Sequence, residues 1–131
     1  MADFSESKPR ALIVHPSAST CRLIRETLEH FCGADVESCP DAQRGFELAL
    51  QRRYQLFLFA LSPPLMKGEL LYDFIGKAYT FCHEGARIPP AIIYLAEEGE
   101  QPSDGALSEA RVKGMLRRPI NIERLLKLAK G

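Results

Sequence analysis

The stretch YQLFLFALSPPLMKG, residues 54–68, decides the fold of this chain. It begins as a run of apolar residues and ends in two prolines and a glycine. A strand that is apolar at every position is buried on both faces, and such strands lie in the middle of parallel sheets that helices cover on both sides. The stretch therefore predicts an α/β domain. Functional groups of open parallel sheets lie just beyond the carboxyl ends of the strands, which directs attention to Ala60, Leu61 and Ser62.

Composition and charge indicate one globular domain that binds neither nucleic acid nor a membrane. The chain has 131 residues, of which 46% are hydrophobic and 26% charged, and 17 basic side chains balance 17 acidic ones. No apolar run approaches the roughly 20 residues that span a bilayer, and the polar N-terminus is not a signal peptide. We expect a cytoplasmic domain over residues 11–131, behind a disordered lead over residues 1–10 that nothing precedes.

The four cysteines and three histidines form no metal-binding pattern. There is no C-x-x-C pair, and the adjacent Cys82 and His83 supply too few ligands for a zinc site. As a catalytic dyad, this pair lacks a third group to orient the histidine. We therefore expect reduced thiols, no metal and no cofactor. An enzyme that uses Cys82 and His83, or His15, ranks last among the functions considered.

Apolar runs and helical stripes alternate along the chain. The expected strands are residues 11–14, 35–38, 55–60, 91–95 and 114–117. The expected helices are residues 18–31, 41–53, 69–80, 104–111 and a last one that begins after Asn121. Ser17, Asp41 and Asn121 are candidate N-caps, and Gly33 is a candidate left-handed stop. Because crossovers are right-handed, five strands alternating with five helices require a parallel sheet with helices on both faces.

Helical spacing also predicts which side chains face the sheet. For the second helix the expected inner residues are Ala42, Phe46, Ala49 and Leu50. For the helix over residues 69–80 they are Leu71, Phe74, Ile75 and Ala78.

The order and spacing of these elements resemble the receiver (CheY-like) domain of bacterial two-component response regulators. Residues 12–16 resemble the first strand and the acidic pair after it. Residues 55–68 resemble the strand that carries the phosphorylated aspartate and its loop, and residues 116–120 resemble the fifth strand with its Lys-Pro pair. The likeness covers residues 11–130. It implies a flavodoxin-like (βα)5 fold, a doubly wound parallel sheet of order 2-1-3-4-5, and a cis peptide between Arg118 and Pro119.

The chain departs from the family at the residues that the family uses for chemistry. The two acids that hold Mg²⁺ are here His15 and Pro16, and the phosphoacceptor aspartate is Ala60. The hydroxyl residue that senses the phosphoryl group is Leu95, and only the invariant lysine keeps its charge, as Arg118. The aromatic switch position of the fifth strand, outside this pocket, carries a methionine.

These departures remove the groups that aspartyl phosphorylation requires. An acyl phosphate forms only on a carboxylate nucleophile, and Ala60 has none. Mg²⁺ prefers several oxygen ligands in octahedral geometry, whereas His15 offers nitrogen and Pro16 offers no side-chain donor. The sequence therefore predicts a pseudo-receiver that is not phosphorylated at this position.

Each of three pocket residues has two possible interpretations. Arg118 either binds an anion or, as we favour, pairs with an acid of the following loop such as Glu97 or Glu98. His15 is either a phosphoryl acceptor or pH sensor, or, as we favour, a partly exposed histidine with local hydrogen bonds. Ser62 is either a phosphorylation site or, as we favour, a turn residue.

The resemblance implies an atypical receiver domain that signals by protein–protein contact in a two-component or phosphorelay-like pathway. Its partners would be signalling proteins or a second copy, bound on the face of the fourth helix, fifth strand and fifth helix. The residues expected on that face are Leu107, Ala110, Arg111, Met115, Arg117, Asn121 and Arg124. The alternative is a module that senses a small anion or a nucleotide in the altered pocket. That pocket would be lined by His15, Ala60, Ser62, Leu95 and Arg118.

Overall fold

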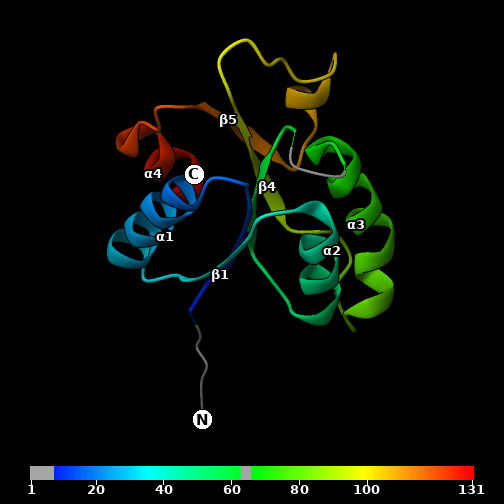
Figure 1. The fold of residues 1–131 in the computed structure, drawn as a ribbon. Coiled ribbons are helices and arrows are strands. Elements are labelled where there is room, and N and C mark those ends of the chain that lie inside the picture. The colour runs from blue at the N-terminus through cyan, green and yellow to red at the C-terminus, as the bar shows by residue number, and fades with distance from the viewer. Residues whose placement is uncertain (1–7, 63–65) are drawn as a thin grey trace.

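A parallel five-stranded sheet forms the middle of the molecule (Figure 1). The computed structural model describes residues 8–62 and 66–131; most of the predicted N-terminal lead and the Pro63-Pro64 loop lie outside the described residues. The strands are β1 (Arg10–Val14), β2 (Asp35–Cys39), β3 (Leu56–Ala60), β4 (Ala91–Ala96) and β5 (Val112–Arg117). Their order is β2-β1-β3-β4-β5, which confirms the predicted flavodoxin-like topology.

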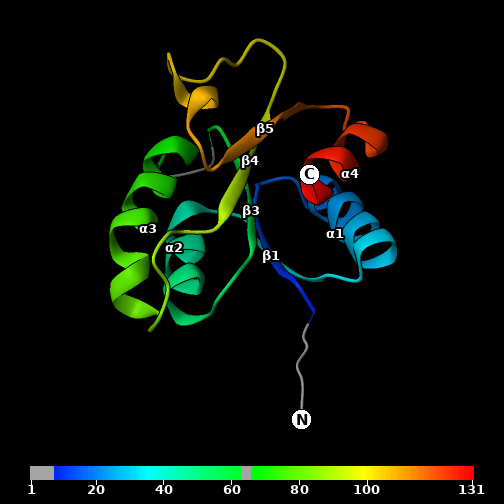
Figure 2. The same cartoon turned by 180° about the vertical axis from the view of Figure 1, so that it is seen from behind.

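Helices cover both faces of this sheet, as predicted. The α-helices are α1 (Ala18–Cys32), α2 (Ala42–Gln51), α3 (Gly68–Cys82) and α4 (Ile122–Lys130). Helices α1 and α4 lie on one side of the sheet and α2 and α3 on the other, which Figures 1 and 2 show from opposite directions. No helix in the described part of the chain is long and apolar enough to cross a membrane.

The predicted helix caps are confirmed. The side chains of Ser17, Asp41 and Asn121 each accept a hydrogen bond from the backbone N–H three residues further on. This geometry satisfies one of the free N–H groups at a helix start. Gly33 ends α1 with a φ of 64°, a left-handed conformation that suits a residue without a side chain.

Strand β3 connects two hydrophobic cores. All five of its residues are buried, and alternate side chains of a strand point to opposite faces. Phe57 and Phe59 stack with ring centroids 4.8 Å apart in the core under α2 and α3. Leu58 points the other way, into the core under α1 and α4. The apolar run at residues 56–60 therefore forms the central strand predicted from it.

The prediction of a helix over residues 104–111 was wrong. This segment contains only a 3₁₀ turn, η2 (Ala106–Ser108), so the described residues hold four α-helices and not five. Gly105 has a φ of 80°, which a right-handed helix does not accommodate. The carboxylate of Glu69 also accepts hydrogen bonds from the backbone N–H and hydroxyl of Ser103, at 2.7 and 2.5 Å. These bonds hold the segment before η2 against α3.

The predicted inner face of α3 was only partly right. Leu71 and Ile75 are buried, but the third residue on the sheet side is Tyr79. Phe74 is 42% exposed, and Ala78 is half-buried. In α2, similarly, the buried residues are Ala42, Gly45, Leu48 and Ala49, whereas Phe46 and Leu50 are half-buried.

Candidate functional site

A cavity of about 290 Å³ lies at the carboxyl ends of the central strands. Its lining includes each residue that the sequence placed in the altered pocket: His15, Pro16, Ala60, Ser62, Leu95 and Arg118. Strand pairing explains part of this arrangement, because Ala60 at the end of β3 is in register with Leu95 of β4. Glu97 and Glu100, from the loop after β4, also line the cavity.

His15 directly follows β1 and is fixed by hydrogen bonds on both sides. Its backbone N–H donates to the carbonyl of Cys39 at 3.1 Å. Its Nδ1 accepts a hydrogen bond from the backbone N–H of Ser17 at 3.0 Å. Since Nδ1 is an acceptor, the neutral ring carries its proton on Nε2, which lies 3.5 Å from Oε2 of Glu97. The imidazole therefore presents its proton to a carboxylate.

The environment of His15 favours the neutral ring. Burial, and then the nearby Arg118 guanidinium, lower the pKa of His15 from its ordinary value, against the opposing effect of Glu97 and Glu100. Only 4% of the residue is exposed, so the expectation of partial exposure was wrong, whereas the expected local hydrogen bond is present. The charged groups beside it, Glu97, Glu100 and Arg118, come from residues more than 80 positions away, which no local pattern reveals.

Arg118 pairs with Glu97, as favoured from the sequence. Its Nε lies 3.0 Å from Oε2 of Glu97, and its Nη1 donates to Oγ1 of Thr20 at 2.7 Å. The peptide between Arg118 and Pro119 is cis, as the resemblance implied. The guanidinium thus joins the start of α1 to the loop after β4. Its charge already faces a carboxylate inside the protein.

Two carboxylates of the cavity were absent from the sequence-based set of site residues. Glu97 was considered only as a partner for Arg118, and Glu100 was not considered. The backbone N–H of Glu97 donates to Oε1 of Glu100 at 2.8 Å, which brings both acids to the cavity. The available signal was the position of these acids just after a buried strand, at the functional edge of a parallel sheet.

The end of β3 offers no nucleophile. Ala60 is 5% exposed and carries only a methyl group. Its carbonyl is covered by the start of α3, because a Cβ on Gly68 would lie 2.0 Å from this oxygen. Ser62 is an exposed residue in a bend at the rim. Among residues 8–62 and 66–131, no group of three or more His, Cys, Asp or Glu side chains is arranged to hold a metal ion.

Cys82 and His83 do not form a dyad. Cys82 is exposed at the end of α3. His83 is buried, and its Nε2 lies 2.8 Å from the carbonyl oxygen of Ala49 in α2. The ring connects the ends of two helices, which is a structural role.

Comparison with solved structures identifies the architecture. A receiver domain protein (CheY-like) from Methanospirillum hungatei JF-1 superposes with a TM-score of 0.76 at 23% identity, covering 95% of this chain and 92% of that one. The signal receiver domain of an HD domain-containing protein from Pseudomonas fluorescens Pf-5 gives 0.75 at 19% identity, covering 96% and 87%. The chemotaxis response regulator CheY4 of Vibrio cholerae gives 0.72 at 23% identity, covering 95% and 98%. This chain has the receiver fold. No protein-family model and no curated protein sequence matches it.

The residues predicted for an interaction face lie along one edge of this receiver fold. Strand β5 is the last strand of the sheet and contributes Met115 and Arg117. Leu107, in η2, is 43% exposed, whereas Ala110 follows η2 in a loop and not in a helix. The remaining members are Arg111 before β5, Asn121 at the cap of α4 and Arg124 in its first turn. The face is therefore built from one strand, one helix and an irregular segment.

Proposed function

We propose that this chain is a signalling module that acts through protein–protein contact without Mg²⁺-dependent aspartyl phosphorylation. The observation that carries this proposal is the methyl group of Ala60 at the carboxyl end of β3, beside an arginine that is already paired. A phosphoryl group needs an acceptor carboxylate and a free cation. Ala60 supplies no carboxylate, and the Arg118 guanidinium is already in contact with Glu97 and Thr20.

The two carboxylates of the cavity do not replace the missing acids. Mg²⁺ requires close to ideal octahedral oxygen coordination. Glu97 faces Arg118 and His15, and Glu100 accepts from the backbone of Glu97. Their oxygens are therefore engaged in a network that stabilises one arrangement of the loop after β4. A fixed arrangement of this loop suits a module whose surface does not depend on phosphorylation.

Intact-mass measurement tests whether the chain is phosphorylated. We expect incubation with acetyl phosphate and Mg²⁺ to leave the mass of the chain unchanged. The matched variant Ala60→Asp should also stay unmodified, because His15 and Pro16 still supply no oxygen ligands. An increase by one phosphoryl group in the unmodified sequence would contradict the proposal. Repeating the reaction with Ser62→Ala and His15→Asn would then locate the acceptor.

The edge formed by η2, β5 and α4 is the face we assign to a protein partner. Leu107 is its exposed apolar residue, and aromatic or arginine anchors commonly dominate such interfaces. The seven residues predicted for this face include three arginines and no acid. Pairing this face with itself would bring like charges together, which is unfavourable. We therefore assign it to a different protein and not to a second copy.

The alternative function, sensing of a small anion or nucleotide, is less well supported by the pocket. Its volume of about 290 Å³ lies near the lower limit for ligand sites. Glu97 and Glu100 place negative charge in it, and Arg118 is already occupied. We expect inorganic phosphate to leave the melting temperature of the chain unchanged relative to sodium chloride of equal ionic strength. Glu97→Gln, which removes the negative charge beside Arg118, should gain stability from phosphate by mass action. Stabilisation of the unmodified chain would favour the sensing module.

A further inference from the structure

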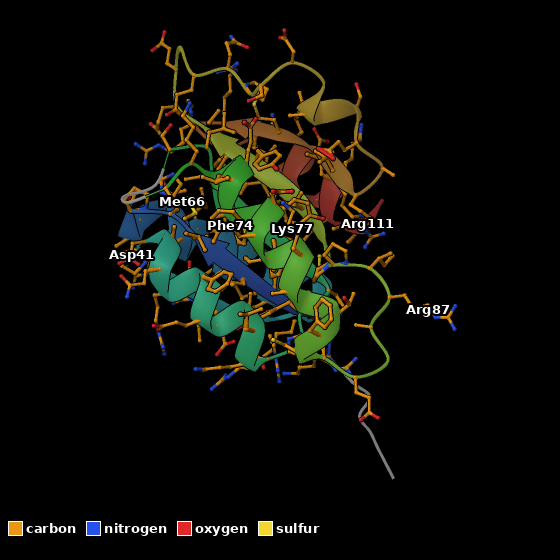
Figure 3. All side chains as sticks on the ribbon, turned by 90° about the vertical axis from the view of Figure 1, so that its right-hand side faces the viewer. Asp41, Met66, Phe74, Lys77, Arg87 and Arg111 are labelled. Carbon is orange, nitrogen blue, oxygen red and sulfur yellow. The ribbon has the colours of Figure 1, made fainter. Side chains whose placement is uncertain are left out.

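The outer face of α3 carries three exposed apolar side chains. Leu70 is 46% exposed, Phe74 42% and Phe81 89%. Phe74, Lys77 and Phe81 follow Leu70 by four, seven and eleven residues. These four side chains therefore lie along one side of the helix over about 16 Å. Figure 3 views α3 from outside and labels Phe74 and Lys77 along it. We call Leu70, Phe74, Lys77 and Phe81 the α3 strip.

Two charged residues of this helix side, Lys77 within the strip and Asp73 beside it, can pair with their counterparts in a second copy. Asp73 and Lys77 lie one turn apart and pair within the chain at 3.2 Å, with side chains 56% and 75% exposed. When two identical helices pack antiparallel around a two-fold axis, the same flanks meet in reversed order. An axis close to residue 75 brings Asp73 of one chain to Lys77 of the other. Both charges then find an opposite partner across the contact.

We infer that the α3 strip binds the α3 strip of a second copy of this chain, with the two helices antiparallel. Two-fold symmetry places Leu70 of one copy near the Phe81 end of the other and brings the two Phe74 rings close to the axis. This side of α3 holds two acids, Glu69 and Asp73, and one base, Lys77, so it attracts neither nucleic acid nor an anionic membrane. The pairing therefore buries the exposed aromatic side chains and gives the charged residues partners of opposite sign.

The expected dimer is weak and adjoins the proposed partner face, because Leu70 and Lys77 line one groove with Ala110 and Arg111. A single pair of helices of this length buries less than the ~1,200 Å² typical of stable complexes, so we expect a dissociation constant of about 10–100 µM. The two surfaces differ at their centres, since Phe74 lies on α3 over one face of the sheet and Arg117 lies on β5 at its edge. Self-association through α3 and the absence of phosphorylation at Ala60 are independent proposals, and an experiment can disprove either one without the other.

Sedimentation velocity of the 131-residue chain between about 5 and 500 µM tests self-association directly. We expect the sedimentation coefficient to rise with concentration, and Phe74→Glu to weaken association by about tenfold or more. The matched control is Phe31→Glu, because Phe31 is 54% exposed on α1, across the sheet from α3. This variant and Arg117→Glu should associate like the unmodified chain. Circular dichroism checks that each variant is folded.

A charge exchange distinguishes a contact between copies from an effect within one chain. Asp73→Lys and Lys77→Asp should each weaken self-association, because like charges then meet across the axis. A mixture of the two variants should recover association, since each supplies the charge that the other lacks. The inference is overturned if the unmodified chain stays monomeric throughout, if Phe31→Glu weakens association as much as Phe74→Glu, or if the mixture associates no better than its components.

Discussion

At the scale of single residues, His15 shows how the cavity is held in one state. Its ring accepts a backbone hydrogen bond on Nδ1 and faces a carboxylate through Nε2. Protonation would give Nδ1 a proton that opposes the Ser17 N–H donor, and would add a positive charge beside Arg118. The folded protein therefore favours neutral His15, which is the direction in which burial lowers its pKa.

This preference predicts a pH dependence of stability. A lowered folded pKa means that the unfolded chain binds a proton more readily, so the free energy of unfolding falls as the pH drops below 6.5, the ordinary value for histidine. His15→Asn keeps an acceptor for the Ser17 N–H but does not titrate. We expect the variant to lose less stability than the unmodified chain between about pH 7.5 and pH 5.5. Urea unfolding at both pH values measures this, and equal losses in the two proteins would contradict it.

The residue positions of the cavity could be predicted from the sequence, but their environment could not. Carboxyl ends of neighbouring parallel strands converge in any such sheet, so His15, Ala60 and Leu95 were placed together correctly. The environment of His15 includes Glu97 and Arg118, whose side-chain directions follow from the paths of the chain after β4 and after β5. Local spacing contains no information about those paths.

At the scale of elements, the start of α3 lies in close contact with the end of β3. The backbone N–H of Gly68 donates to the carbonyl of Leu61 at 2.9 Å, and its Cα faces the carbonyl oxygen of Ala60. This contact fixes the position of α3 relative to the end of β3.

Two glycines of α3 should respond to alanine in opposite ways. Gly68→Ala would place Cβ 2.0 Å from backbone oxygen, so we expect a loss of about 2–3 kcal/mol in the free energy of unfolding. Gly76→Ala meets only a proline side-chain atom at 3.7 Å and should gain about 0.5–1 kcal/mol, because glycine is unfavourable inside a helix. Urea titrations compare the two. If Gly68→Ala were as stable as Gly76→Ala, the close approach would not exist in solution.

Element prediction succeeded where local signals and tertiary contacts agree. The apolar run of β3 and the caps at Asp41 and Asn121 act within a few residues, and all were predicted correctly. The segment 104–111 has helical composition, but Gly105 and the Ser103–Glu69 hydrogen bonds hold it in another conformation. Helix α3 is apolar around most of its circumference, so periodicity alone did not select its inner side. The same distribution of apolar residues leaves Leu70, Phe74 and Phe81 exposed on its outer face.

At the scale of the whole molecule, stability is concentrated around the central strand. Strand β3 pairs with β1 and β4 and contributes to the cores on both faces of the sheet. Breaking it exposes both cores at once. Residues 98–111, by contrast, include no buried residue, and hydrogen bonds to Glu69 attach them to α3. The two regions should therefore open with very different free energies.

Hydrogen exchange of the folded protein would separate these two levels of opening. We expect the amides of β3 to exchange only through global unfolding, and that of Ser103 through local opening. Glu69→Ala removes the acceptor of the Ser103 amide, so its exchange should accelerate by roughly fivefold, the value of one exposed hydrogen bond. Glu26→Ala is the matched control, because Glu26 forms an exposed pair with Arg22 within α1. It should leave Ser103 unchanged. If Glu69→Ala accelerated β3 and Ser103 by the same factor, the loop and the sheet would open as one unit, and the partner face beside η2 would depend on the stability of the entire domain.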